Sequence, residues 1–424
     1  MIQTLTLADG IKLHCFYDNR FKQGCLSFQM VRPMCDEEAS LNALLPAVLL
    51  RGTQVHPDLR SLTLHLDNLY GASVDSMIMR VGDHHTTGLH CTLMDDRFAL
   101  PGDTVLKPVL DFLEELLLAP ALENGVFRTD YVESEKKNLI SALESEINNK
   151  RAYALRQMIR TMCKDDSLRI GRLGDKDRVA AITPQSLYDH YRKILRESPI
   201  EMFYVGSASA QQMAQLLMPL ISRLDRDHKP CRLQTVFSGA ACGHHVERMD
   251  VAQAQLCMGY VTPIVTESPE FAAMQMMNTI FGSGMTSKLF MNVREKLSLC
   301  YSIGSAYYTS KGIILLSAGI DAAKEQEVTD EIKVQLQAMC DGDITDEEMA
   351  SAREALLSGL RCVHDSPNAI SNYYFGAKLS DLHMTPAEYQ ARIAAVTKAD
   401  VAAVARTLKL HTTYILKGDD HEEI

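Results

Sequence analysis

The feature that most constrains the fold of this chain is an internal duplication, with a period of about 210 residues in a sequence of 424. A period of this length is too long for a stacked repeat and is typical of a duplicated domain. Each copy begins with an apolar strand, predicted at 25–31 and 255–261. A helix follows each strand and stops at a glycine, Gly52 or Gly282. The shared order predicts two homologous repeats.

The remaining elements of the two copies also follow one another in the same order. Each copy has a short helix, a strand hairpin, an amphipathic helix, a long helical region, and a closing helix and strand. The hairpins are predicted at 73–93 and 300–320, and the long helical regions at 129–162 and 346–363. Hairpins followed by helices predict an α+β fold, in which each repeat is a mostly antiparallel sheet with helices on one face.

The boundaries of the repeats follow from a change in composition. The stretch 223–243 is charged and contains glycine, which is typical of a linker between domains. We therefore predict an N-terminal repeat at 1–222 and a C-terminal repeat at 244–424.

Composition argues against several classes of protein. The net charge is −11 and the acidic residues are spread along the chain, which disfavours nucleic acid and anionic membranes as partners. No apolar run reaches the roughly 18 residues that a membrane-spanning helix needs. We also expect no secretory signal, because the first residues lack a basic segment followed by an apolar one. The 11 cysteines occur without a C-x-x-C pair, which is typical of a reducing compartment. We expect a cytoplasmic protein.

A glycine-rich turn in the second copy carries a resemblance to a known family. The sequence reads Phe-Gly-Ser-Gly-Met-Thr-Ser-Lys-Leu-Phe over 281–290, then Val-Arg-Glu-Lys at 293–296 and Tyr-Ser at 301–302. This pattern resembles the second-half signature of the insulinase/pitrilysin-type zinc peptidases. Together with the duplicated layout, the resemblance covers nearly the whole chain. It implies the two-repeat fold of those enzymes and of the mitochondrial processing peptidase.

The resemblance also indicates where a zinc site would lie in an active member. There the first helix carries H-x-x-E-H before a basic residue, Gly and Thr; the two His bind Zn²⁺ and the Glu takes a proton from the zinc-bound water. Here the tail of that motif remains at 51–53. The positions of the two His, the general base and the third ligand are degenerate: Ala43, Ala47, Pro46 and Ala142. The resemblance thus implies no catalytic residue, no metal and no other cofactor.

Substrate contacts, in contrast, are implied by residues that the second copy keeps. The family uses an Arg as a charged donor to peptide carbonyls and a Tyr as a hydroxyl donor, which correspond to Arg294 and Tyr301. Gly282 and Gly284 form the turn beside them. The alternative is structural: Arg294 is then a solvated residue at a helix end, and Tyr301 a half-buried strand residue.

Two further features of the first copy have structural interpretations. His84, His85 and His90 resemble a metal cluster, but neighbours in a strand point to opposite faces, so we expect a surface hairpin. Pro46 lies about eight residues inside its helix and cannot donate to the carbonyl of Asn42. We therefore expect a kink or local widening of the helix at 42–46.

Two functions from different classes remain open. The first is a non-catalytic, substrate-positioning subunit that acts on peptides with a zinc-motif-bearing partner, in a clamshell heterodimer or as a homodimer. Metalloendopeptidase activity is then expected only in the mixed complex. The resemblance extends to the zinc-less member of a bacterial pair associated with 5-aminopentanol modification of elongation factor P. The second is a structural or chaperone-like scaffold that has lost peptidase work. An autonomous metallopeptidase with a relocated site is a third alternative.

Overall fold

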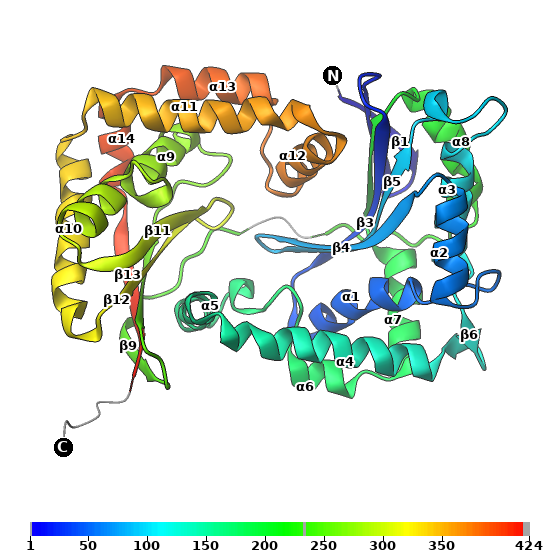
Figure 1. The fold of residues 1–424 in the computed structure, drawn as a ribbon, viewed down its shortest axis with the longest axis horizontal. Helices are drawn as coiled ribbons and strands as arrows, with labels where there is room; N and C mark the ends of the chain where they lie inside the picture. Colours follow the sequence, from blue (N-terminus) through cyan, green and yellow to red (C-terminus); the bar gives the residue numbers. More distant parts are fainter. Residues whose placement is uncertain (1, 232–234, 419–424) are drawn as a thin grey trace. The chain divides into compact units, whose positions relative to one another are not determined.

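Two separate β-sheets organise the chain, one in each repeat (Figure 1). The computed structural model describes residues 2–231 and 235–418. The first sheet has six strands in the order β1-β2-β8-β3-β5-β4, and the second has five in the order β11-β12-β10-β13-β9. Both are mostly antiparallel, since only β2 with β8 and β13 with β9 run parallel. The α+β fold predicted from the sequence is confirmed.

The first sheet is centred on β3, which pairs antiparallel with both β5 and β8. Nine consecutive residues of β3 are buried, because the strand is covered on both faces. The strands are β1 (Ile2–Ala8), β2 (Ile11–Tyr17), β3 (Gln23–Pro33), β4 (Ser73–Val81), β5 (His84–Met94) and β8 (Ile200–Gly206). The helices are α1 (Asp36–Leu49), α2 (Leu59–Asn68), α3 (Leu106–Leu118), α4 (Thr129–Ser145), α6 (Lys176–Ala181), α7 (Pro184–Glu197) and α8 (Ala210–Ser222). A small hairpin joins β6 (Leu122–Glu123) and β7 (Val126–Phe127).

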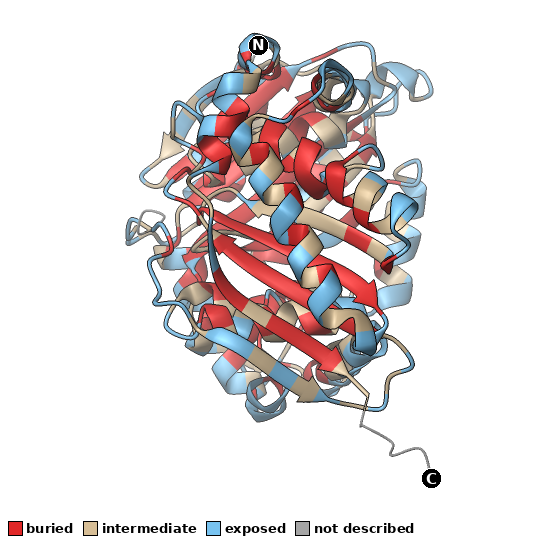
Figure 2. Ribbon diagram, turned by 90° about the vertical axis from the view of Figure 1, so that its left-hand side faces the viewer, coloured by how far each residue is buried: buried red, intermediate tan, exposed pale blue. Residues whose placement is uncertain are grey.

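The second sheet is centred on β10 and β12, and every residue of β12 is buried. Figure 2 shows the buried residues following the strands and the helix faces turned toward them. The strands are β9 (Gly243–Arg248), β10 (Ala254–Val261), β11 (Cys300–Tyr308), β12 (Ile313–Ile320) and β13 (Lys409–Lys417). The helices are α5 (Lys150–Met162), α9 (Phe271–Asn278), α10 (Glu325–Asp341), α11 (Asp346–Cys362), α13 (Pro386–Ala395) and α14 (Lys398–Ala405).

No helix in the described parts of the chain is both long and apolar enough to span a bilayer.

The long helical regions of the two copies match in length. In the first copy, α4 has 17 residues, the short turn η2 (Glu146–Asn148) has three and α5 has 13. In the second copy, α11 has 17 residues, η7 (Val363–Asp365) has three and α12 (Pro367–Leu379) has 13. This agreement supports the internal duplication inferred from the sequence.

The compact units nevertheless differ from the linear division at 222 and 244. The first unit contains 2–144, 170–231 and 364–376, and the second contains 145–169, 235–363 and 377–418. The first copy's α5 packs on β10 and β13, whereas Ile370 of the second copy's α12 packs against the first sheet. These two segments thus pack in the compact unit of the other copy, while the repeat boundaries at 222 and 244 stay a prediction. An apolar stripe shows that a helix is covered but does not show which sheet covers it.

Pro46 lies within α1 without interrupting it. Residues 36–49 form one continuous α-helix, so the expected widening is absent from this described segment. The carbonyl of Asn42, which the proline leaves without its helical donor, accepts a hydrogen bond from the hydroxyl of Thr87 on β5 at 2.7 Å. A neighbouring strand thus supplies the hydrogen bond that the proline removes, and the expected kink stays a prediction.

We predict that Thr87→Val lowers the free energy of unfolding by about 1–3 kcal/mol, because it leaves the buried Asn42 carbonyl without a donor. The measurement is the midpoint of urea unfolding. In a Pro46→Ala background, which restores the helical N–H, the same substitution should have a smaller effect. Thr86→Val is the matched control, since the buried hydroxyl of Thr86 has no hydrogen-bond partner among residues 2–231 and 235–418. Equal losses at Thr86 and Thr87 would contradict this account of the helix.

Candidate functional site

The four degenerate zinc-site positions carry no group that could bind a metal. Ala43 and Pro46 are buried on α1, Ala47 is partly buried, and Ala142 is exposed on α4. Zinc needs deprotonated thiol, imidazole or carboxylate ligands, and these side chains are hydrocarbon. Among residues 2–231 and 235–418, no group of three or more His, Cys, Asp and Glu side chains could hold a metal ion. The residues present do not fit the zinc site of the active enzymes.

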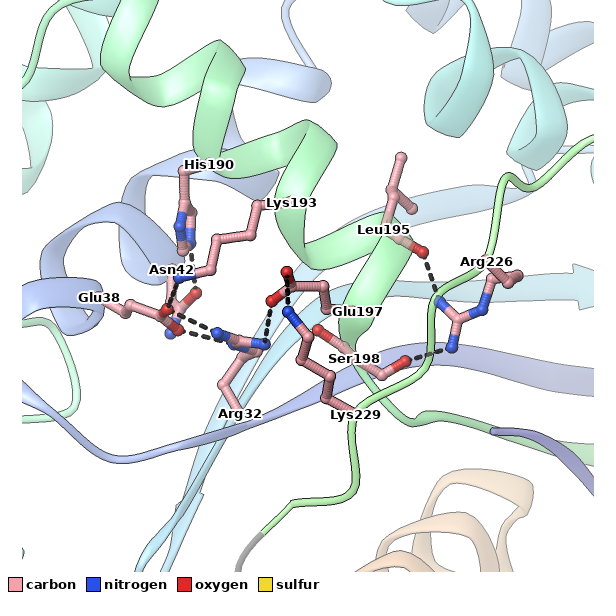
Figure 3. Close-up of polar contacts among 10 residues, drawn as sticks. All are labelled: Arg32, Glu38, Asn42, His190, Lys193, Leu195, Glu197, Ser198, Arg226 and Lys229. Atoms are coloured by element: carbon pink, nitrogen blue, oxygen red, sulfur yellow. Dashed lines mark hydrogen bonds and ion pairs between the residues drawn. The ribbon is translucent and has the colours of Figure 1, made fainter. Parts of the chain in front are cut away.

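α1 is nevertheless held in place at its first turn by charged contacts (Figure 3). The carboxylate of Glu38 accepts two hydrogen bonds from the guanidinium of Arg32, both at 2.6 Å, and one from Lys193 of α7 at 2.7 Å. Burial alone would raise the pKa of Glu38, but these donors outweigh it and lower the pKa to about 2. The carboxylate is therefore ionised at neutral pH, and it also interacts favourably with the helix dipole.

One turn further along α1, the fully buried side chain of Asn42 bridges two histidines. Its Oδ1 accepts a hydrogen bond from Nε2 of His190 at 2.8 Å, and its Nδ2 donates to Nδ1 of His85 at 3.2 Å. Burial lowers the pKa of both histidines to about 4, so both rings are neutral at pH 7. His85 is 0% exposed, so its expected place on a surface hairpin is wrong. Asn42 thereby fixes α1 to both α7 and β5.

The tail of the degenerate motif contacts the long helix α4. Arg51 donates from Nη1 to Oε1 of Glu135 at 3.2 Å, and its guanidinium lies over the ring of Tyr131 at 5.2 Å. Glu135, the acid seven residues before Ala142, thus pairs with an arginine. The end of α1 and the start of α4 are joined by an ion pair and a cation–π contact.

The glycine-rich turn of the second repeat begins at the end of one π-helical segment, η4 (Thr279–Ser283), and leads into a second, η5 (Leu289–Lys296). Such segments are rare and are often found at functional sites. A Cβ on Gly282 would lie 2.7 Å from Oγ of Ser305 on β11, so only glycine allows this close approach. Ser305 is itself fixed, because it donates to Oδ1 of Asn278 at 2.8 Å. Gly284 has open space where a side chain would stand.

Arg294 and Tyr301 lie in contact beside this turn. Nε of Arg294 donates to the backbone carbonyl of Tyr301 at 3.0 Å, and Nη1 pairs with Glu295 at 2.7 Å. The guanidinium lies over the ring of Phe290 at 4.5 Å. Tyr301 is 68% exposed at the start of the edge strand β11, and is therefore not the half-buried strand residue of the structural alternative.

A pocket of about 320 Å³ opens next to the two glycines. Strands β11 and β12 contribute part of its lining, and α5, the glycine-rich turn and η5 contribute the rest. All of these segments belong to the second unit. The lining residues are Arg151, Leu155, Gly282, Ser283, Gly284, Met285, Phe290, Ile303, Gly304, Ser305, Ala306, Tyr308, Leu315 and Ser317.

Comparisons with known proteins agree on one family. A family profile described as "Peptidase M16 inactive domain" matches residues 181–356. The chain is 28% identical over 411 residues to the "Probable inactive metalloprotease YmfF" of Bacillus subtilis (strain 168), covering 97% of this chain and 96% of that protein. The chain is thus similar to the peptidase M16 proteins over nearly its whole length. Without the catalytic motif, it is an inactive metalloprotease homologue of the M16 type. The insulinase/pitrilysin resemblance is thereby confirmed, while the likeness to the elongation factor P pair stays a prediction.

Solved structures show the same M16 fold. The structure of a conserved protein from Enterococcus faecalis V583 matches with a TM-score of 0.92 at 26% identity, over 100% of both chains. That of a peptidase M16 inactive domain from Pseudomonas fluorescens matches with a TM-score of 0.82 at 16% identity, also over 100% of both chains. The fold class predicted from the sequence is confirmed by these two structures.

Sequence reasoning missed several residues of this M16 chain that the structure makes important. The polar contacts of Asn42 and the position of Arg151 in the pocket depend on segments distant in sequence. One signal was available: Pro46 inside a helix implies an unpaired carbonyl four residues earlier, and hence a donor from elsewhere. No comparable signal pointed to Arg151.

We predict that the purified M16 chain, prepared without a histidine tag, retains no stoichiometric zinc after dialysis. Hydrocarbon side chains at 43, 46, 47 and 142 provide neither ligands nor a base. Elemental analysis is the measurement, and a variant lacking His84, His85 and His90 is the control for adventitious binding. One tightly held zinc ion per chain that survives in this variant would contradict the prediction.

We also predict that the stability of the first unit falls between pH 6.5 and pH 4. The pKa of His85 and His190 is lowered from 6.5 to about 4, so in this window the unfolded chain binds more protons and acid favours unfolding. Glu38, whose pKa is lowered from 4.5 to about 2, contributes only at lower pH. His190→Gln, which keeps a donor for Asn42, should reduce the loss in urea midpoint between pH 7 and pH 5.

The control for this experiment is His383→Gln, at an exposed position. An acid-induced loss of the same size in the native chain and in both variants would show that His190 does not contribute.

Proposed function

We propose that this chain is a non-catalytic, substrate-positioning subunit that acts on peptides together with a zinc-motif-bearing M16 partner. The observation that carries the proposal is the difference between the repeats. The first keeps the helix of the zinc motif, firmly anchored through Glu38 and Asn42, but has hydrocarbon side chains at the catalytic positions. The second keeps Arg294 in contact with an exposed Tyr301 beside a pocket.

The second repeat offers a peptide three kinds of contact. Strand β11 lies at the edge of its sheet, so its backbone can pair with an extended chain. Arg294 and Tyr301 add hydrogen-bond donors beside this edge, and the pocket accepts a side chain. Orientation and hydrogen bonding lower a reaction barrier only when a nucleophile is present. A partner with an intact H-x-x-E-H motif would supply the activated water.

A scaffold function is the second candidate, and one observation favours it. Among the described residues, Arg294 makes its polar contacts with Tyr301 and Glu295, as expected for a residue that stabilises the end of η5. Under this hypothesis Arg294 affects folding or assembly and does not affect turnover.

We predict that the chain alone cleaves no peptide and that the mixture with its partner cleaves faster than the partner alone. Arg294→Ala should lower kcat of the mixture by about tenfold or more, since removal of one oxyanion-hole donor from a serine protease lowers kcat by about 10² to 10³. Tyr301→Phe should lower it in the same direction. Cleavage of a panel of basic and apolar peptides is the measurement, and size-exclusion chromatography shows whether the complex still assembles.

Arg392→Ala is the matched control, because Arg392 is an exposed arginine on α13. Robust, chelator-sensitive cleavage by this chain alone would overturn the proposal. A mixture no more active than the partner, or unaffected by Arg294→Ala, would favour the scaffold function.

A further inference from the structure

We propose, on the basis of the function above, that the pocket beside the glycine-rich turn binds a carboxylate of the peptide together with an apolar side chain. Arg151, on α5, is the residue that recognises the carboxylate. The pocket measures about 320 Å³, at the small end of the range of about 300–1,000 Å³ for ligand pockets. This size suits one side chain or a chain terminus.

The lining of the pocket combines apolar and hydroxyl-bearing side chains with a single charge. Leu155, Met285 and Ile303 are among its apolar members, and Ser283 adds a hydroxyl group. Among the described residues that line it, Arg151 alone is charged. Met285 is 77% exposed, and its flexible side chain can adapt to different apolar groups. A ligand that matches this lining carries one negative charge next to an apolar group.

The guanidinium of Arg151 is held in position without an acidic partner. Its Nε donates to Oγ of Ser317 on β12 at 2.9 Å, and Ser317 is buried. Within 2–231 and 235–418, Arg151 has no ion pair with an Asp or Glu. The two terminal nitrogens therefore remain available, and their planar fork matches the two oxygens of a carboxylate. In a chain of net charge −11, an unpaired arginine in a pocket favours an acidic ligand.

The place of Arg151 in its helix supports the same conclusion. Lys150 and Arg151 occupy the first turn of α5, which has no acidic residue. Positive side chains are unfavourable there, because the N-terminal end of a helix is the positive end of its dipole. A carboxylate bound to Arg151 would bring a negative charge to this end of the helix, where the dipole stabilises it. A local rule broken at the edge of a pocket is expected where a residue serves binding.

Two glycines leave the peptide backbone room to approach. A Cβ on Gly304 of β11 would lie 3.5 Å from Nη2 of Arg151, so the guanidinium passes directly over bare strand backbone. Gly284, which also lines the pocket, has no atom of the described residues within 4 Å of the place where a Cβ would stand. A ligand main chain can therefore lie close to the guanidinium while its side chain enters the pocket.

The experiment measures peptide binding to the full chain alone, by fluorescence anisotropy. Three labelled peptides share one apolar sequence: one has a free C-terminal carboxylate, one a C-terminal amide, and one an amide with an internal Glu. We expect the amide without Glu to bind at least tenfold more weakly than one of the acidic peptides. The acidic peptide that binds identifies the source of the carboxylate.

Variants then assign the recognition to Arg151. Arg151→Ala should weaken binding of the acidic peptide about tenfold or more and leave that of the neutral amide unchanged, while Arg151→Lys should retain part of the affinity. Arg160→Ala is the matched control, because Arg160 is exposed on the same helix and does not line the pocket. Arg151→Gln, which keeps a side-chain N–H, covers the case in which the alanine variant does not fold.

The outcomes separate this inference from the proposed function. Equal binding of acidic and neutral peptides, or full affinity in Arg151→Ala and Arg151→Gln, overturns the carboxylate site but leaves a peptide-binding subunit. Absence of peptide binding by the native chain overturns the carboxylate site as well. The proposed function is tested separately, by the effect of Arg294→Ala on cleavage by the mixed complex.

Discussion

The first repeat depends on the hydrogen bonds of one buried residue, Asn42. Its side chain accepts from His190 and donates to His85, and its carbonyl accepts from Thr87. An unpaired polar group at this depth would be unfavourable by about 1–3 kcal/mol. Since the three partners come from α7 and β5, satisfying Asn42 also places α1 on its sheet. The Glu38 carboxylate, one turn earlier, adds the contacts to Arg32 and Lys193.

This anchoring explains how an M16 repeat keeps its shape without the zinc motif. In an active enzyme of this type a metal joins the first helix to the long helix. Here Arg51, just beyond the end of α1, forms an ion pair with Glu135 of α4, while Glu38 and Asn42 fix the first turns of α1. The scaffold and the catalytic chemistry are therefore separable. Loss of the ligands removes the reaction and leaves the fold.

The pocket of the second repeat is formed in part by α5, a helix that belongs to the first copy of the sequence. α5 follows α4 in the first copy, yet it packs on β10 and β13 and brings Arg151 to the glycine-rich turn. The turn itself depends on Gly282, because any side chain there would clash with Ser305 of β11. The binding features of the second repeat are thus assembled from segments more than a hundred residues apart.

The sequence by itself determined the duplication, the α+β class, the family and the loss of the zinc ligands. Each of these depends on local patterns: hydrophobic periodicity, glycine stops, and residue types at fixed spacing at Ala43, Pro46 and Ala47. The contact between Arg294 and Tyr301 could also be inferred from the sequence, since only seven residues separate them. Periodicity shows that a helix has an apolar face, and it indicates little about the partner of that face.

The tertiary structure alone decided which sheet each helix covers and which polar groups meet in the interior. It placed α5 with the second sheet and Ile370 of α12 with the first, because burial depends on the shape of the sheet and not on chain order. It also shows that His85, expected at the surface, is buried and accepts a hydrogen bond from Asn42. Hydrogen bonds of this kind join residues 43 to 148 positions apart, and no local pattern in the sequence records them.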